Sequence, residues 1–201
     1  MRNKSNYNGG LTREQFLFFE IRTVAALTCK EMSKEDIISK IQSENLFQFP
    51  TERMVKSIAN TCFKRIDALK SELLVHHLAN ASVEAARQIN LYAIMRQNAI
   101  VWEFMTDVIG EKFRTQRFDF SQKDINIFFM ELQERVPEIT KWSESTIKKI
   151  KQVLRKFLVE CKYLDNVKSQ QLNPVYLFPE LEDGILENND LQVLSAFNYF
   201  M

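Results

Sequence analysis

Hydrophobic residues recur every three or four positions along most of the chain, with polar residues between them. This spacing places the apolar side chains on one face of a helix and is typical of amphipathic helices packed on a core. The longest such stretch follows Ser82 and contains Ala85, Ile89, Tyr92, Met95, Ala99, Trp102 and Met105. We expect Gly110 to end or interrupt it. Four Gly and four Pro in 201 residues are too few turn formers for a many-stranded sheet, so the pattern predicts a mainly α fold.

One pattern of helix, break and helix occurs twice. In the first copy, Ser33 precedes one predicted helix and Thr51 precedes the next; in the second copy, Ser121 and Ser143 take these places. Ser and Thr are favoured N-caps because their side chains accept from free N–H groups of the first turn. The copies are offset by 88 residues at the first cap and 92 at the second, so the second copy has a four-residue insertion. Helix-turn-helix nucleic-acid binders have this arrangement, so the repeat predicts two such heads, either both binding nucleic acid or one binding it and the other adapted for scaffolding.

We expect three parts along the chain. Residues 1–70 form an N-terminal helix-turn-helix-like head, and residues 71–115 form a helical middle. Residues 116–201 form a C-terminal winged-helix-like head with a docked C-terminal segment. Because the middle is rich in apolar and aromatic residues, we expect both heads to pack on it.

Local signals refine this outline. Thr12 and Gln15 have the spacing of a capping box and predict the start of the first helix. Residues 173–179 have a proline near each end and are expected to be extended, so the fold contains at most a short β hairpin near 165–180. A strand or hairpin after a basic helix is the order expected of a wing. The apolar residues between 184 and 201 predict a final docked helix.

The helix after Ser143 has a strongly basic outer face. A helical projection from Ile147 places one group of polar residues opposite the apolar side: Ser145, Lys148, Lys149, Gln152, Arg155 and Lys156. Lys and Arg neutralise phosphates and release counterions, so the four cations are candidate backbone contacts. Ser145 and Gln152 are the candidates for base edges. Together with the possible wing, this face favours nucleic-acid binding.

The helix after Thr51 has a weaker version of the same face. Its candidate contact residues are Arg53, Lys56, Asn60 and Lys64. Every amphipathic helix has a polar outside, and Lys is common there, so a merely solvated face explains this copy equally well. Both explanations stay open for the first head.

The distribution of charge along the chain is asymmetric. The chain carries 27 basic and 26 acidic residues, a net charge of +1, yet residues from Tyr163 onward include one basic residue and six acids. Residues 1–162 therefore carry +6. Chance scatter explains this asymmetry, and so does a basic body that meets phosphate while an acidic segment folds elsewhere.

Several classes of function find no support. The chain has no phosphate-cradling Gly loop, nucleophile elbow or metal-spaced His and Cys cluster, so we expect no enzyme, cofactor, metal or small-molecule substrate. Adjacent histidines at 76 and 77 point about 100° apart on a helix and cannot chelate one metal together. Three distant cysteines indicate buried thiols in a reducing cytoplasm. Without an apolar run of membrane length or a signal core, we expect neither a membrane span nor secretion.

Short motifs distributed along the chain resemble a known family. They are Tyr7-Asn8-Gly9-Gly10-Leu11, Phe49-Pro50-Thr51-Glu52-Arg53 and Lys141-Trp142-Ser143-Glu144-Ser145-Thr146-Ile147, followed by Leu154, Leu158 and Tyr163-Leu164. These look like BrxA, the small component of the BREX bacteriophage-exclusion systems, and the similarity runs roughly from Tyr7 to Phe178. The resemblance implies a cytoplasmic, mostly helical protein that helps other BREX components act on phage DNA, and it suggests double-stranded DNA as a ligand. It implies no catalytic residues.

Two descriptions used for this family bear on the expected location and ligand. An inner-membrane label disagrees with the absence of a membrane-length apolar run. A NusB-like label would predict RNA as the ligand. We therefore expect a non-enzymatic double-stranded DNA-binding accessory protein, with a protein-protein adaptor of the defence complex or a NusB-like RNA binder as the alternatives. Sequence preference is expected to be modest, because the faces hold many Lys and few bidentate base readers.

Overall fold

A computed structural model describes residue 7, residues 9–13 and residues 15–200. The chain forms two compact units, each built from separate stretches. Unit 1 comprises Met1–Phe16, Asn98–Leu177 and Asn189–Met201, and unit 2 comprises Leu17–Gln97 and Phe178–Asn188. Across the described residues the regular structure is helical, and β pairing is limited to one isolated bridge, so the expected mainly α fold is confirmed.

Unit 2 contains the first copy of the repeat. Its helices are α1 (Phe18–Thr28), α2 (Lys34–Ser43), α3 (Glu52–Leu69), α4 (Glu72–Asn80), α5 (Val83–Gln97) and α11 (Pro179–Glu187). Helix α3 packs on α1 and α5, and α11 packs on α4 and α5. Gly184 permits the close approach of α11, because a Cβ there would lie 2.4 Å from Leu74 Cγ. The amide of Asn188 donates to Leu69 O at 2.8 Å and fastens the end of α11.

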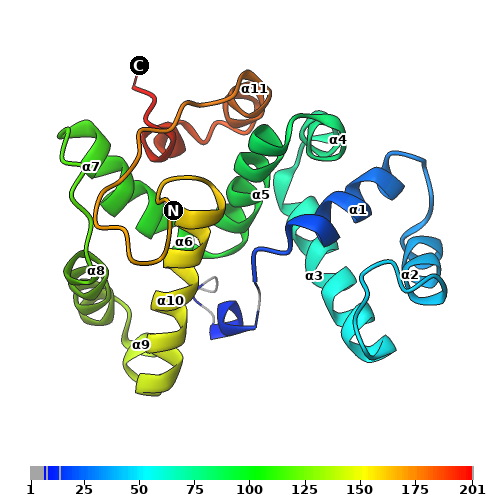
Figure 1. Cartoon of the computed structure of the whole chain (residues 1–201), viewed down its shortest axis with the longest axis horizontal. Coiled ribbons are helices and arrows are strands. Elements are labelled where there is room, and N and C mark those ends of the chain that lie inside the picture. Colours follow the sequence, from blue (N-terminus) through cyan, green and yellow to red (C-terminus); the bar gives the residue numbers. More distant parts are fainter. Residues whose placement is uncertain (1–6, 8, 14, 201) are drawn as a thin grey trace. The chain divides into compact units, whose positions relative to one another are not determined.

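Unit 1 contains the second copy. Its helices are η2 (Gly9–Thr12), α6 (Ala99–Glu103), the π-helix η3 (Phe104–Gly110), α7 (Glu111–Arg114), α8 (Gln122–Arg135), α9 (Pro137–Thr140), α10 (Glu144–Glu160) and the 3-10 helix η4 (Leu191–Phe197). Within this unit η4 packs on η3 and α7, α8 packs on η3, and η2 packs on α10 (Figure 1). The fully buried Tyr163 donates its hydroxyl hydrogen to Ala196 O at 2.9 Å, which ties the segment after α10 to η4.

All four capping residues of the repeat occupy the predicted places. Ser33, Thr51 and Ser143 each accept from the backbone N–H three residues on, at 3.1, 3.3 and 3.2 Å. Ser121 forms a capping box with Asp124, whose carboxylate accepts from Ser121 N at 2.7 Å. The four extra residues of the second copy lengthen its first helix, because α8 has 14 residues and α2 has 10, whereas seven residues separate the end of that helix from the next cap in each copy. In the second copy this break contains the short helix α9, which begins with a proline. The helix-break-helix pattern of each copy is therefore present.

Two predicted helix boundaries are wrong. The first helix begins at Phe18 and not at Thr12, because residues 9–12 form a short 3-10 helix in which Thr12 Oγ1 donates to Gly9 O at 3.0 Å. The long helix after Ser82 breaks at Asn98, whose φ of −131° and ψ of 116° are extended. Gly110 keeps helical angles and does not end the helix. The break at Asn98 is also the boundary between the units and falls inside the expected middle, residues 71–115. The three-part division by function stays a prediction.

Three further expectations need correction. The apolar C-terminal segment forms α11 and η4, in different units, and not one final helix, because residues 188–190 interrupt it. The expected strand at 173–179 is irregular up to Phe178, and Pro179 begins α11. Cys62 and Cys161 are buried as expected, but Cys29 is exposed.

In the described part of the chain, no helix combines the length and apolar character needed to cross a bilayer.

Candidate nucleic-acid interface

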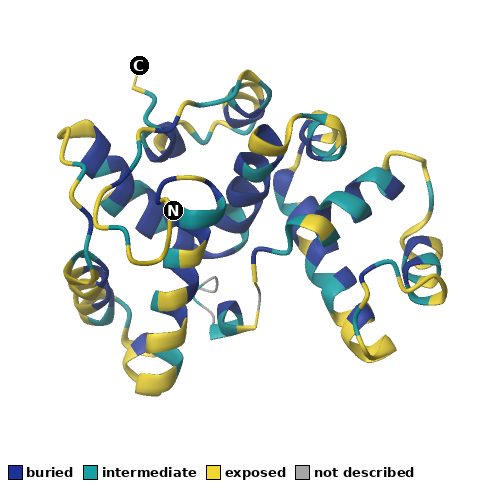
Figure 2. Cartoon of the chain, in the orientation of Figure 1, coloured by how far each residue is buried: buried dark blue, intermediate teal, exposed yellow. Residues whose placement is uncertain are grey.

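Helix α10 is the element that positions the second basic face. Ser143 caps its first turn, and its inner side is buried at Ile150, Val153, Leu154, Phe157 and Leu158. With one side fixed against the core, the polar residues at the intervening positions must face outward. Figure 2 shows this division along α10, with buried and exposed positions alternating at helical spacing.

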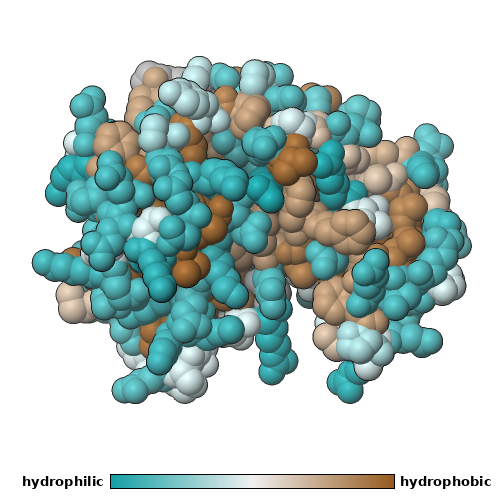
Figure 3. All heavy atoms as spheres, viewed as in Figure 1, coloured by the Kyte–Doolittle hydropathy of each residue, from teal (hydrophilic) through white to brown (hydrophobic). Residues whose placement is uncertain are grey.

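The residues predicted on this face are largely accessible. Ser145, Lys148, Lys149, Gln152 and Lys156 are exposed, and Arg155 is half-buried. Within the described part of the chain, no hydrogen bond or ion pair engages the ammonium groups of Lys148, Lys149 and Lys156. In the view of Figure 3, hydrophilic residues dominate the surface around α8, α9 and α10. Three uncommitted cations on one helix are suited to an anionic partner.

Arg155 is already engaged by its own unit. Its Nε donates to Val167 O at 2.5 Å, and its Nη2 donates to Ser169 O. The guanidinium carbon lies 5.3 Å from the ring centroid of Phe120, and burial lowers the pKa of Arg155. Arg155 therefore holds the segment after α10 against the helix, in addition to contributing charge.

That segment is a closely hydrogen-bonded loop covering residues 161–173. Asn166 and Ser169 form a turn in which Ser169 N donates to Asn166 O at 3.1 Å and Lys168 N donates to Asn166 Oδ1 at 2.9 Å. Beyond the turn, Leu172 N donates to Phe118 O at 2.7 Å, beside the antiparallel bridge between Asp119 and Gln171. The β pairing near the expected wing thus joins residues 118–120 to residues 170–172, and no hairpin closes within 165–180.

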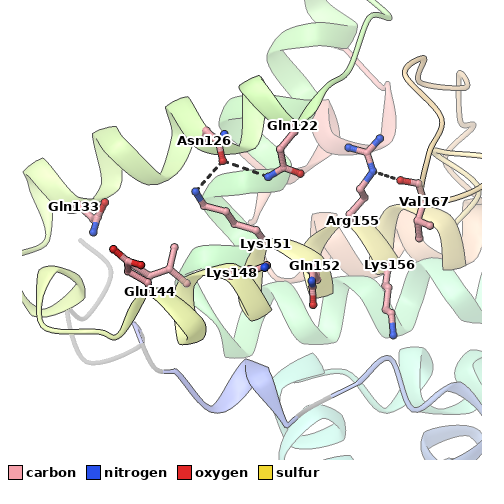
Figure 4. Close-up of a pocket in the computed structure, with 11 residues that line it drawn as sticks. Gln122, Asn126, Gln133, Glu144, Lys148, Lys151, Gln152, Arg155, Lys156 and Val167 are labelled. Carbon is pink, nitrogen blue, oxygen red and sulfur yellow. Dashed lines mark hydrogen bonds between the residues drawn. The ribbon is translucent and has the colours of Figure 1, made fainter.

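A groove lies between α8 and α10 in unit 1. It has a volume of about 850 Å³ and is lined by Gln122, Asn126, Gln133, Glu144, Ile147, Lys148, Lys151, Gln152, Arg155, Lys156 and Val167. Four of these residues are cationic and one is acidic. Figure 4 shows the amide side chains of α8 on one side and the basic side chains of α10 on the other. The groove is therefore polar and positively charged.

Lys151 belongs to this groove although the sequence pattern did not select it. Its Nζ donates to Asn126 Oδ1 at 2.8 Å, and the same oxygen accepts from Gln122 Nε2 at 3.2 Å (Figure 4). The ammonium also lies 5.2 Å from the ring centroid of Phe129, and burial lowers the pKa of Lys151. Its spacing of three and four residues from Lys148 and Arg155 was the available signal. The α8 amides carried no signal of their own, because their role depends on how α8 packs beside α10.

The first basic face lies on α3 in unit 2. Arg53, Lys56 and Lys64 are exposed, and Asn60 is half-buried. Asn60 donates its side-chain amide to Lys56 O at 2.9 Å, which leaves its carbonyl oxygen for any base contact. The two faces belong to different units. In the described residues, no group of three or more His, Cys, Asp or Glu side chains is arranged to hold a metal ion.

The family model and the sequence relatives name the same family. The family model described as BrxA matches residues 5–189. The chain is 32% identical over 165 residues to a BREX protein BrxA of Bacillus cereus (strain H3081.97), covering 82% of each protein. It is 23% identical over 175 residues to a BREX protein BrxA of Paramagnetospirillum magneticum (strain ATCC 700264 / AMB-1), covering 87% of each. The fold is similar to the crystal structure of an uncharacterized protein from Magnetospirillum magneticum, with a TM-score of 0.81, 21% identity, and coverage of 96% of this chain and 98% of that chain.

Proposed function

The chain belongs to the BrxA family, and on that premise we propose that it is a non-enzymatic accessory protein of a BREX-type phage-defence system that binds double-stranded DNA. In this proposal α10 is the main contact element. Lys148, Lys149 and Lys156 meet phosphates, and Ser145 and Gln152 lie toward base edges. Other BREX components are its protein partners.

The observation that carries the proposal is the uncommitted charge on α10. Lys148, Lys149 and Lys156 are exposed and unpaired within the described residues, and they project from a capped helix whose opposite side is buried. A rigid helix with free cations can neutralise several phosphates without first breaking internal ion pairs. The loop that Arg155 holds beside α10 takes the role of the wing. The α3 face, with Arg53, Lys56, Asn60 and Lys64, is a possible second contact.

A salt titration of duplex binding tests the proposal. For a protein that neutralises several phosphates, the logarithm of the association constant falls linearly with the logarithm of the salt concentration, with a slope of about −0.9 per phosphate. The double variant Lys148→Glu/Lys156→Glu is expected to lower the slope by about two and weaken binding at least ~10-fold. The matched control Lys30→Glu/Lys70→Glu makes the same charge change at exposed positions that belong to neither predicted face, and it should bind much more like the wild type.

The alternatives give different results in the same experiment. A protein-protein adaptor would show no steep loss of duplex affinity between low and moderate salt. A NusB-like RNA binder would prefer structured RNA over duplex DNA of equal length in direct competition. If the double variant binds duplex DNA as tightly as the Lys30/Lys70 control, α10 is not the contact surface.

A further inference from the structure

We propose that the groove between α8 and α10 holds one phosphodiester strand of the bound duplex, contacted from α10 by Lys148 and Lys151 and from α8 by the amides of Gln122 and Asn126. This inference rests on the proposed function and deepens it. It adds a second helix to the interface and assigns contact roles to residues that a basic-face argument does not select.

The hydrogen bonds around Asn126 leave several N–H donors available to a ligand. Asn126 Oδ1 already accepts from Lys151 Nζ and from Gln122 Nε2, whereas the Asn126 amide nitrogen has no hydrogen bond with any described residue. The Lys151 ammonium has three N–H donors, and one of them is used. A cluster whose shared acceptor is occupied and that still offers the Asn126 amide and two Lys151 N–H donors is suited to an oxyanion, such as a phosphate oxygen.

The charge and length of the groove fit a strand and not a single small anion. Its lining contains Lys148, Lys151, Arg155 and Lys156 against one carboxylate, Glu144. Along α8 the lining runs from residue 122 to residue 133, which corresponds to roughly 16 Å at 1.5 Å per residue. Successive phosphates of one strand advance by about 3.4 Å along the duplex axis, so the groove is long enough for several of them.

Lys151 is held in place before any ligand arrives. Its ammonium is bonded to Asn126 and lies beside the Phe129 ring, whose residue is 1% exposed. A fixed donor loses less side-chain entropy on binding than a free surface lysine does. The competing explanation is that the Lys151–Asn126 bond only ties α8 to α10. Substitutions that keep that bond but change the charge separate these explanations.

The experiment measures binding of a fluorescently labelled duplex to the full chain at several salt concentrations. Asn126→Asp keeps an oxygen acceptor for Lys151 but removes the amide donor and neutralises the lysine. Gln122→Glu adds the same charge one helical turn earlier. Each variant is expected to weaken binding by about five-fold or more and to lower the salt slope by about one. Gln192→Glu is the matched control, since it makes an equal charge change at an exposed position of unit 1 outside the groove.

Thermal unfolding followed by circular dichroism confirms that each variant is folded. If Gln122→Glu and Asn126→Asp bind like Gln192→Glu while Lys148→Glu/Lys156→Glu loses affinity, the groove assignment is overturned and the proposed function stands. If the wild-type chain shows no salt-dependent duplex binding, the proposed function itself fails, and the groove assignment fails with it.

Discussion

Replacing Arg155 with lysine separates the charge of this residue from its role in holding the loop. The guanidinium bridges two backbone carbonyls, those of Val167 and Ser169, and faces the ring of Phe120. Lysine keeps the positive charge, but its single ammonium cannot match the fork geometry that reaches both oxygens. Arg155→Lys should therefore loosen the loop while leaving the net charge of α10 unchanged.

The magnitude follows from the contacts that are lost. A hydrogen bond to a charged group contributes about 1.5–3 kcal/mol, and values near the lower end apply here because Arg155 is half-buried. A cation–π contact adds about 0.5–1 kcal/mol at an accessible site. We expect Arg155→Lys, which retains one hydrogen bond, to lower the free energy of unfolding by about 1–2 kcal/mol. Arg155→Ala should lower it by about 2–4 kcal/mol.

Tryptophan fluorescence during urea unfolding measures this loss. Both tryptophans of the chain, Trp102 and Trp142, lie in unit 1, so the signal reports on the unit that contains the loop. A cost of 1–2 kcal/mol should lower the midpoint by about 1 M urea. Lys123→Arg, at an exposed position where no described residue pairs with the ammonium, is the control and should stay within about 0.5 kcal/mol of the wild type.

The same variant tests the connection to binding. If the loop acts as the wing, Arg155→Lys should reduce duplex affinity although no charge is lost, and Lys123→Arg should not. An Arg155→Lys protein with wild-type stability and wild-type affinity would refute the reasoning, because the two carbonyl contacts would then have no consequence.

Two further predictions concern packing and pH. Gly184→Ala should lower the free energy of unfolding by about 1–3 kcal/mol, because its Cβ would lie 2.4 Å from Leu74 Cγ. The double variant Gly184→Ala/Leu74→Ala should lose less stability than the sum of the two single variants, because the smaller side chain at 74 relieves the contact. Strictly additive losses in urea unfolding would contradict the close contact. Burial alone would raise the pKa of Asp124, but hydrogen bonds from Lys112 and Ser121 hold it below its ordinary value. The stability that the ionised Asp124 contributes is therefore present at neutral pH and is lost as pH falls below about 4. Asp124→Asn should lower the melting temperature at pH 7 and make the melting temperature less dependent on pH in acid. The same acid dependence in both proteins would contradict this prediction.

The features that the sequence predicted well are local ones. A capping side chain accepts a hydrogen bond from a backbone N–H two or three residues away, so the start of a helix can be predicted without knowing the rest of the fold. This holds for the helices capped by Ser33, Thr51, Ser121 and Ser143. The outer face of α10 was also accessible to prediction, because the burial of one side of a helix determines where its polar residues point.

The features that were missed depend on contacts between distant segments. Thr12 and Gln15 have the spacing of a capping box, yet the fully buried Leu11 holds this segment as a 3-10 turn packed on α10. Arg155 looked like a surface cation, but its partners at positions 167 and 169 lie in a loop whose path no local rule gives. The groove residues on α8 carry neither charge nor periodic signal, and only the packing of two helices reveals them.

The interleaving of the two units has a consequence for biosynthesis. Unit 2 begins with α1 but is completed by α11, which is translated only after α10, and η4 then completes unit 1. As the chain emerges from the ribosome, neither unit can close before the other is largely made. No single proteolytic or genetic cut therefore yields either unit intact, and an isolated half must be assembled by joining separated stretches through an artificial link.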